Sequence, residues 1–263
     1  MAAMTENITP VTTEVVDGIA TLTLRAPHRR NPLSKDTMRT ATRLLRELDA
    51  DRQVRVIVIA AEGPAFSAGH DLAEVAGAEL DDQREIFGAC SDLMLTLHEV
   101  RQPVIAKVAG MALAAGCQLV ATCDLAIAAD TARFSTPGVK IGLFCSTPMV
   151  PLTRAVGRKR AMHMLLTGEM IDAATAADWG LINQAVPADE LDRAVAQLAA
   201  SIAASSSATL AIGKRAFYDQ IDVSEPAAYE LMSETMAANA VIPDAREGIS
   251  AFLEKRPPVW ADR

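Results

Sequence analysis

Short apolar runs alternate with stretches of helical periodicity through the first two thirds of the chain. In residues 19–25 apolar and polar side chains alternate strictly. Residues 54–60 are nearly all apolar, as in a strand buried on both faces. These predicted strands are residues 19–25, 54–60, 104–109 and 124–129. Apolar side chains at helical spacing predict helices at 35–49 and 86–100, and Pro103 stops the second helix. Strands alternating with helices indicate an α/β fold with parallel strand pairing.

From about residue 188 onward the strand pattern disappears and the periodicity becomes helical. Ser224 followed by Pro226 predicts a helix start. Asp244 and Glu247 have the spacing of a capping box before another apolar stretch, which predicts a further helix start there.

The chain therefore divides into an α/β body, residues 1–200, and a C-terminal helical region, residues 201–263. Pro257 and Pro258 are expected to end the last helix. The helical region is rich in Ala and Met, and an exposed apolar surface of this kind is most simply buried against another subunit. We therefore expect this region to mediate oligomerisation.

Composition and charge exclude several classes of protein. Of the 263 residues, 50% are hydrophobic and 22% are charged, which is a globular composition and not that of a disordered chain. The formal net charge of −8 argues against a nucleic-acid partner, because such proteins show a basic surface. A phosphorylated ligand held by a few local cations remains compatible with this charge.

The N-terminal sequence and the cysteines bear on the compartment. Residues 1–10 contain neither the basic nor the apolar segment of a secretion signal, and no run of 18 apolar residues occurs. We therefore expect a cytoplasmic protein with no membrane partner. The four cysteines and four histidines show no metal-ligand spacing, and the cysteines are expected to be reduced thiols.

Two glycine-containing segments follow predicted strands. They are G-P-A-F-S-A-G-H-D-L (63–72) and A-G-M-A-L-A-A-G-C-Q-L (109–119). Small residues leave backbone N–H groups free to point outward, and two converging N–H groups can form an oxyanion hole. The second segment also opens an apolar helix, whose N-terminus favours negative charge. Two tight turns that serve only close packing would give the same pattern.

The order of these motifs resembles the crotonase (enoyl-CoA hydratase/isomerase) superfamily. C-D-L-A-I-A-A-D (123–130), G-L-I-N-Q-A-V-P (180–187) and the closing E-G-I-S-A-F-L-E-K-R-P-P (247–258) follow in the family's order, so the resemblance covers nearly the whole chain. It implies a crotonase-type spiral of ββα units, with C-terminal helices that form a homotrimer or a dimer of trimers. It also implies stabilisation of a thioester enolate by two backbone N–H groups.

The resemblance places the two N–H donors at His70 and Ala115. The two catalytic glutamates of the hydratases fall on Gln118 and Gly138 here. A glutamine amide orients water but takes no proton near neutral pH, and glycine offers no group at all. The loss of general acid–base help costs about 10²–10⁴ in rate per group, which argues against standard hydratase chemistry. Residues 141–148 also resemble a branch of the superfamily that lacks both glutamates.

Other side chains offer chemistry as well as packing. The His70 imidazole is a candidate for proton transfer, because its own backbone lines the predicted hole. The Cys145 thiol, near the acyl pocket of the family, is either a nucleophile or a buried apolar side chain. Asp71 and Asp124 are expected to accept backbone N–H groups. Glu74 lies either near the pocket mouth or on a solvated helix face.

Coenzyme A carries phosphates, for which guanidinium groups are suitable ligands. Arg25, Arg29 and Arg30 cluster where the family places its nucleotide-binding loop, and each is otherwise an ordinary solvated turn residue. The family also contributes Phe and Lys from its last helix, often across a subunit boundary. The substrate-binding residues that the resemblance implies are Arg25, Arg29, Ala68, Gly69, Asp71, Leu72, Cys145, Phe252 and Lys255.

Three functions remain open at the level of sequence. The first is an enoyl-CoA hydratase/isomerase-like lyase or isomerase with a non-standard base. The second is an acyl-CoA thioesterase that positions water with Gln118. The third is a non-catalytic protein that binds acyl-CoA or enoyl-CoA. None of them needs a cofactor beyond the coenzyme A of the thioester. Restoring both glutamates at 118 and 138 is the substitution that separates a pseudoenzyme from an enzyme with another base.

Overall fold

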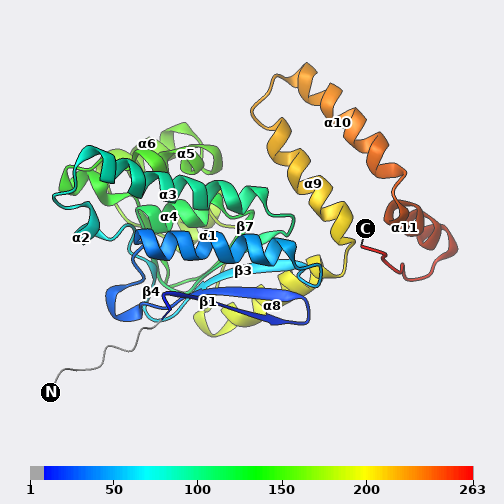
Figure 1. Cartoon of the computed structure of the whole chain (residues 1–263), viewed down its shortest axis with the longest axis horizontal. Coiled ribbons are helices and arrows are strands. Elements are labelled where there is room, and N and C mark those ends of the chain that lie inside the picture. Colours follow the sequence, from blue (N-terminus) through cyan, green and yellow to red (C-terminus); the bar gives the residue numbers. More distant parts are fainter. Residues whose placement is uncertain (1–8, 263) are drawn as a thin grey trace.

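The computed structural model describes residues 9–262 and shows an α/β body from which a helical arm extends (Figure 1). The N-terminal segment 1–8, in which the sequence shows no leader pattern, lies outside the described residues. No single described helix is long and apolar enough to cross a membrane. One pair, Ala188–Ala203 with Ser207–Gln220, reaches the required length and composition only jointly, and its members meet at 103°.

Within residues 9–262, ten strands form two sheets. The larger sheet has the order β1-β2-β3-β5-β7-β10, with β1 antiparallel to β2 and the other pairs parallel. Its strands are β1 (Val11–Val16), β2 (Ile19–Leu24), β3 (Val56–Ala61), β5 (Val104–Val108), β7 (Leu125–Ala129) and β10 (Gln184–Val186). The smaller sheet has the order β4-β6-β8-β9, with strands β4 (Ala65–Ser67), β6 (Met111–Leu113), β8 (Arg133–Ser135) and β9 (Ile171–Asp172).

Consecutive strands alternate between the two sheets before a helix follows. The pairs β3 and β4, β5 and β6, and β7 and β8 each place one strand in either sheet. The body helices are α1 (Lys35–Ala50), α2 (Leu72–Val75), α3 (Leu80–Glu99), α4 (Ala115–Thr122), α5 (Ser146–Ala155), α6 (Arg158–Thr167), α7 (Ala173–Trp179) and α8 (Leu191–Ala203). Short 3₁₀ helices are η1 (Pro27–Arg29), η2 (Pro137–Ile141) and η3 (Ala188–Glu190). This arrangement confirms the predicted α/β fold and the spiral of ββα units.

The larger sheet is buried on both faces. Ile57 and Ile59 of β3 pack in the main core with α1, α3 and α4, whereas Val56 and Val58 pack in a second cluster with α8. Figure 1 shows α1, α3 and α4 on one side of β3 and α8 on the other. The continuous apolar run at 54–60 therefore predicted the environment of β3 correctly.

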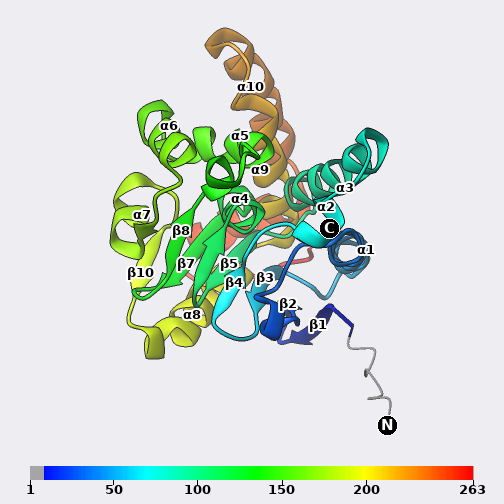
Figure 2. The same ribbon diagram turned by 90° about the vertical axis from the view of Figure 1, so that its left-hand side faces the viewer.

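The C-terminal arm consists of α9 (Ser207–Gln220), α10 (Glu225–Ala240) and α11 (Pro243–Glu254). Figure 2 shows α10 extending beyond the helices that cover the core. No residue of α9 or α10 is fully buried; the apolar side chains of α9 are mostly half-buried, and those of α10 are mostly exposed. The expected helical region is thus present, and α10 starts directly after Ser224 as predicted, although the Ser224 side chain makes no capping hydrogen bond.

The predicted capping box at Asp244 is wrong. The helix α11 begins at Pro243, and Asp244 instead accepts hydrogen bonds from Ser206 Oγ and from the N–H groups of Ala261 and Asp262. Asp244 is buried, so its carboxylate fastens the C-terminal tail to the start of α9. Local spacing could not reveal partners that lie so far away in the sequence.

Candidate functional site

The loops that follow β4 and β6 lie in direct contact. Gly69 has a φ of +97°, and a Cβ atom on it would lie 2.9 Å from the Ala114 Cβ and 3.3 Å from the Ala115 nitrogen. A Cβ atom on Gly116 would lie only 2.4 Å from the Ser67 carbonyl oxygen. Only glycine allows this approach, so the two segments singled out in the sequence meet at one place.

Each of these loops presents a backbone N–H without an acceptor. Ala115 is the first residue of α4, and Ala114 before it has the unusual φ and ψ of 49° and −116°. The Leu33 N–H donates to the Gly69 carbonyl, and the Leu33 carbonyl accepts from the Asp71 N–H. The N–H of His70, which lies between these two residues, makes no hydrogen bond to Leu33. Within residues 9–262, neither the His70 nor the Ala115 N–H donates to an acceptor. Donors of this kind are available to a ligand oxygen.

The His70 side chain is half-buried and lies against α3. Its ring meets the Phe87 ring edge-on at 5.1 Å between centroids, and its Nε2 is buried without a hydrogen-bond partner among the described residues. Burial lowers the pKa of His70 to about 4, so the imidazole is neutral at neutral pH. A weakly basic imidazole is a poor acceptor for the proton of a water molecule.

Gln118 lies one turn after Ala115 on α4 and is buried. Its Oε1 is 3.6 Å from the Cys90 Sγ on α3. Burial raises the pKa of Cys90 to about 12, so this thiol stays protonated. The Gln118 amide therefore contacts a neutral thiol, and Cys90 does not act as a base beside it.

The position of the second family glutamate has no room for a side chain. A Cβ atom on Gly138 would lie 2.0 Å from the Leu143 carbonyl oxygen and 2.8 Å from the Cys145 Sγ. The Leu143 N–H also donates to the Gly138 carbonyl, which closes the segment on itself. Restoring both glutamates therefore does not separate a pseudoenzyme from an enzyme with another base. Gln118→Glu leaves the backbone in place, whereas Gly138→Glu forces the backbone at Leu143 to move.

Cys145 is a buried thiol. Burial raises its pKa, although a hydrogen bond from the backbone of Gly138 acts in the opposite direction. Of the two alternatives for Cys145, the structure thus favours the buried apolar side chain. All four cysteines lie within the described residues, are buried, and form no disulfide.

Two of the three clustered arginines are paired with carboxylates. Arg25 Nε lies 2.8 Å from Glu62, and Arg29 lies 2.8 Å from Asp71. Arg30 is exposed and forms no ion pair or side-chain hydrogen bond with any described residue. Arg30 is therefore the cation of this cluster that is most available to a phosphate.

The predicted acceptor roles of two aspartates are confirmed. Asp71 accepts the Ala73 N–H at the start of α2, and Asp124 accepts the Val104 N–H at the start of β5. Glu74 accepts the Lys35 N–H at the start of α1. Glu74 thus holds two elements together and does not face a pocket as a free acid.

The remaining predicted ligand contacts lie apart. The Ala68 N–H is used by the Arg30 carbonyl, and Leu72 opens α2 with its side chain half exposed. Phe252, 83% exposed, and Lys255 are at the end of α11. Figure 1 shows α11 at the opposite end of the molecule from α2, so one chain does not bring Phe252 and Lys255 to His70.

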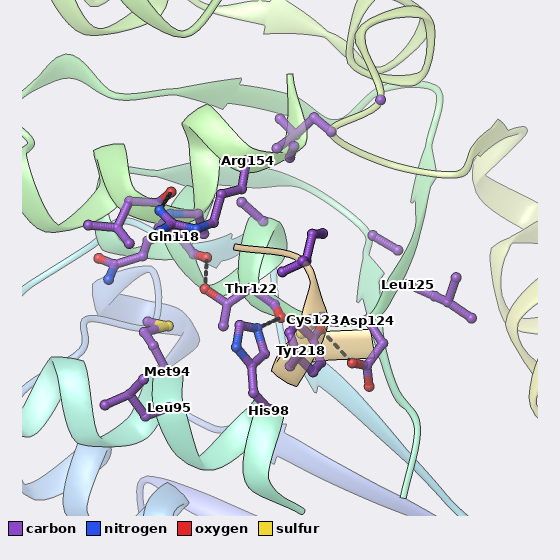
Figure 3. A pocket seen from close by; sticks show the side chains of 18 of the residues that line it. Met94, Leu95, His98, Gln118, Thr122, Cys123, Asp124, Leu125, Arg154 and Tyr218 are labelled. Carbon is purple, nitrogen blue, oxygen red and sulfur yellow. Dashed lines mark hydrogen bonds between the residues drawn. The ribbon is translucent and has the colours of Figure 1, made fainter. Parts of the chain in front are cut away.

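A cavity of about 690 Å³ lies between α3, α4, α5 and α9 (Figure 3). Gln118 forms part of its wall, together with Leu95, His98, Arg154 and Tyr218. The sequence did not reveal this cavity; of its lining residues, only Gln118 and Asp124 were singled out in the sequence, and neither as part of a cavity. Its lining comes from five separate segments, within residues 91–98, 118–126, 147–155, 180–183 and 217–222, and no local motif marks them as neighbours.

Comparison with known proteins bears on the whole chain. Residues 14–263 match the family model described as enoyl-CoA hydratase/isomerase. The chain is 45% identical over 247 residues to the mitochondrial enoyl-CoA hydratase domain-containing protein 3 of Rattus norvegicus, covering 93% of this chain and 82% of that protein. These relatives support the branch that the motifs at 141–148 indicated.

Two solved structures agree closely with this fold. The human enoyl-CoA hydratase domain-containing protein 3 has a TM-score of 0.93 and 44% identity, covering 95% of this chain and 100% of that one. An enoyl-CoA hydratase of Mycobacterium smegmatis has a TM-score of 0.93 and 44% identity, covering 95% and 98%.

The comparisons correct the expected compartment. The rat, mouse and human relatives are named mitochondrial proteins, which contradicts the cytoplasmic location expected from the N-terminal sequence. Leader segments are read by receptors and are not part of the fold, so an argument from composition was a weak one. The fold, the motif order and these matches agree: the chain belongs to the enoyl-CoA hydratase/isomerase family of the crotonase superfamily.

Proposed function

We propose that this protein binds acyl-CoA or enoyl-CoA thioesters and holds the thioester carbonyl oxygen between the His70 and Ala115 N–H groups. The observation that carries the proposal is the pair of N–H donors without acceptors on two loops in contact. Two fixed donors stabilise the negative charge that develops on a carbonyl oxygen when an enolate forms. The dipole at the start of α4 acts in the same direction. No cofactor beyond coenzyme A enters this proposal.

Standard hydration is not part of the proposal. Hydration of an enoyl thioester needs one group that takes a proton from water and a proton for the adjacent carbon. Gln118 takes no proton, Gly138 has no side chain, and the lowered pKa of His70 makes its imidazole a weak base. We expect enoyl-CoA turnover far below that of a glutamate-containing hydratase.

A second candidate is a non-catalytic acyl-CoA-binding protein. The closed backbone at Gly138 and Leu143 favours it, because the place of an acid or base is filled and not merely vacant. The lyase or isomerase reading requires His70 to act as the base. The thioesterase reading requires Gln118 to position water that no neighbouring base activates.

The proposal includes assembly as a homotrimer or a dimer of trimers. Phe252 and Lys255 lie far from His70 in one chain, so they contribute to a coenzyme A site only through another copy. Exposed apolar side chains on α9, α10 and α11 give that copy a surface to bury. Light scattering should then give a mass that is three or six times 27.9 kDa.

The experiment has two readouts on the same samples. Thermal unfolding with free coenzyme A, butyryl-CoA and crotonyl-CoA should show stabilisation of about 2.7 kcal/mol at one hundred times Kd. Loss of the conjugated enoyl absorbance reports turnover. Binding without turnover supports the non-catalytic reading. Turnover that disappears in His70→Ala supports the enzyme with a non-standard base. If no thioester stabilises the protein, the proposed function is rejected.

A further inference from the structure

The 26–34 segment, between β2 and α1, pairs with the loop that follows β4. Leu33 forms a parallel bridge with His70. In such a bridge the N–H and C=O groups of one residue bond to the two neighbours of the other, whose own N–H and C=O groups point to the opposite edge. Leu33 bonds in this way to Gly69 and Asp71. The His70 N–H therefore points away from Leu33 and stays free for a ligand.

Asn31 fixes the 26–34 segment to the chain just before this loop. Its side chain is buried, and its Nδ2 donates to the carbonyls of Glu62 and Ala65 at 2.8 Å each. Its Oδ1 accepts the Ala26 N–H at 2.8 Å. The backbone of Asn31 has a φ of +50°, in the left-handed region that asparagine tolerates better than most side chains. Three hydrogen bonds thus hold the segment against the connection between β3 and β4.

Arg29 fixes the same segment to the chain just after His70. Its Nη2 lies 2.8 Å from Asp71 Oδ2, and the Asp71 side chain is only 10% exposed. The other carboxylate oxygen of Asp71 accepts the Ala73 N–H at the start of α2. Arg29 and Asn31 therefore hold the loop on both sides of the His70 N–H.

The Asn31 amide has no donor left for a ligand. Both hydrogens of its Nδ2 are donated to backbone carbonyls, and an asparagine side chain has no further donor. Any effect of Asn31 on a ligand must therefore pass through the backbone that it holds in place.

We propose that Asn31 and Arg29 are positioning residues that aim the His70 N–H at the thioester carbonyl. This inference rests on the proposed thioester site, because it concerns the direction of one of the two donors of that site. A hydrogen bond weakens steeply as its angle departs from linearity, so a small rotation of the loop weakens the contact without unfolding the protein. The Ala115 N–H is set by α4 and does not depend on either side chain.

The test measures the infrared stretch of the carbonyl in bound butyryl-CoA that is isotope-labelled at the thioester carbon. Two fixed N–H donors polarise the C=O bond, so the wild-type complex should show a lower stretching frequency than butyryl-CoA in solution. Asn31→Gly removes the amide and keeps the left-handed backbone accessible, and it should move the frequency back toward the solution value. Affinity for butyryl-CoA relative to free coenzyme A should fall by up to about fivefold, the equivalent of one hydrogen bond.

Gln102→Gly is the matched control. Gln102 is also buried, and its Nε2 donates to two backbone carbonyls, those of Leu48 and Val54, at 3.0 and 3.3 Å. These contacts join the end of α1 to the chain before β3 and do not involve the His70 loop. Gln102→Gly should lower thermal stability as Asn31→Gly does, but leave the carbonyl frequency at the wild-type value.

Arg29→Met is the second variant, and it should fold because the Arg29 side chain is 51% exposed. It should shift the frequency in the same direction by a smaller amount. Arg46→Met is its control, since Arg46 is 57% exposed and pairs with Asp92 at 2.9 Å on other helices.

The wild-type frequency in both Asn31→Gly and Arg29→Met overturns the inference, because the two side chains then serve stability alone. If Asn31→Gly does not fold, Arg29→Met decides by itself, and an unchanged frequency in it overturns the inference. In both cases the lowered frequency of the wild-type complex leaves the proposed thioester site intact. A wild-type complex with the solution frequency, or no binding of butyryl-CoA, rejects the proposed function itself.

Discussion

Three backbone segments meet near the candidate site, and they use their polar groups differently. The loops after β4 and β6 keep the His70 and Ala115 N–H groups free, and glycines at 69 and 116 bring the loops together. The segment after β8 closes on itself, with the Leu143 carbonyl and the Cys145 thiol where a side chain at 138 would begin. The difference shows that the first two segments leave N–H donors available to a ligand, whereas the third leaves no room for a side chain at position 138.

Gly138→Glu should have the largest effect of the variants that probe this difference. Its Cβ collides with a backbone oxygen, and its carboxylate would be buried, so we expect a loss of about 3 kcal/mol or more. Thermal unfolding measures this loss. Gly88→Glu is the control, because Gly88 lies in the exposed part of α3 with no atom within 4 Å of its Cβ position. A folded Gly138→Glu protein with new hydratase activity would contradict the closed segment.

The His70 side chain gives the next largest effect, through pH. Its pKa in the folded protein, about 4, is below the ordinary value of 6.5, so the unfolded chain binds a proton first. The stability from the neutral ring is present above pH 6.5 and is lost as the pH falls toward 4, by up to about 3 kcal/mol. His70→Leu should flatten this part of the stability profile.

The same variant separates the side chain from the backbone of residue 70. His70→Leu keeps the N–H group, so thioester affinity at neutral pH should remain close to that of the wild type. A large loss of affinity would show that the imidazole, and not the N–H, holds the ligand. Chemical unfolding at several pH values and calorimetry on the same preparations supply both measurements.

Gly116→Ala tests the contact between the two loops. The added methyl group meets the Ser67 carbonyl oxygen, so α4 must move away from β4, at a cost of about 2 kcal/mol. Affinity for thioesters should fall with it, because the two N–H groups separate. Gly213→Ala in α9 is the matched control, since its Cβ has open space and alanine favours a helix by about 1 kcal/mol. Equal thioester affinity in Gly116→Ala and Gly213→Ala would show that binding does not depend on the contact between the two loops.

Cys145→Ala should have the smallest effect. The thiol is buried and its raised pKa keeps it protonated, so it is not an active nucleophile. We expect a loss of stability of about 1 kcal/mol and unchanged thioester binding. Turnover that depends on Cys145 would instead assign it to the chemistry, and would reopen the segment after β8 as a catalytic element.

The sequence was sufficient to predict the longer helices and strands, but not the short strands. The predicted helix at 35–49 matches α1 at Lys35–Ala50, and the predicted strand at 19–25 matches β2 at Ile19–Leu24. The strands β4, β6, β8 and β9 have two or three residues each, too few to show a period. Yet these strands form the second sheet and carry the loops of the candidate site.

By itself the sequence indicated the family, because its motifs are runs of neighbouring residues, and through that resemblance it implied the spiral of ββα units and the expected positions of the two N–H donors. Tertiary structure alone decided whether those groups are usable. Arg29 is paired with Asp71, the pKa of His70 is lowered by burial, and Gly138 is covered by Leu143. It also decided the cavity, whose walls come from five segments. Charge pairing and desolvation are set by groups distant in sequence, and the closure at Gly138 is set by the path of the backbone from 138 to 145, so the residue pattern records none of them.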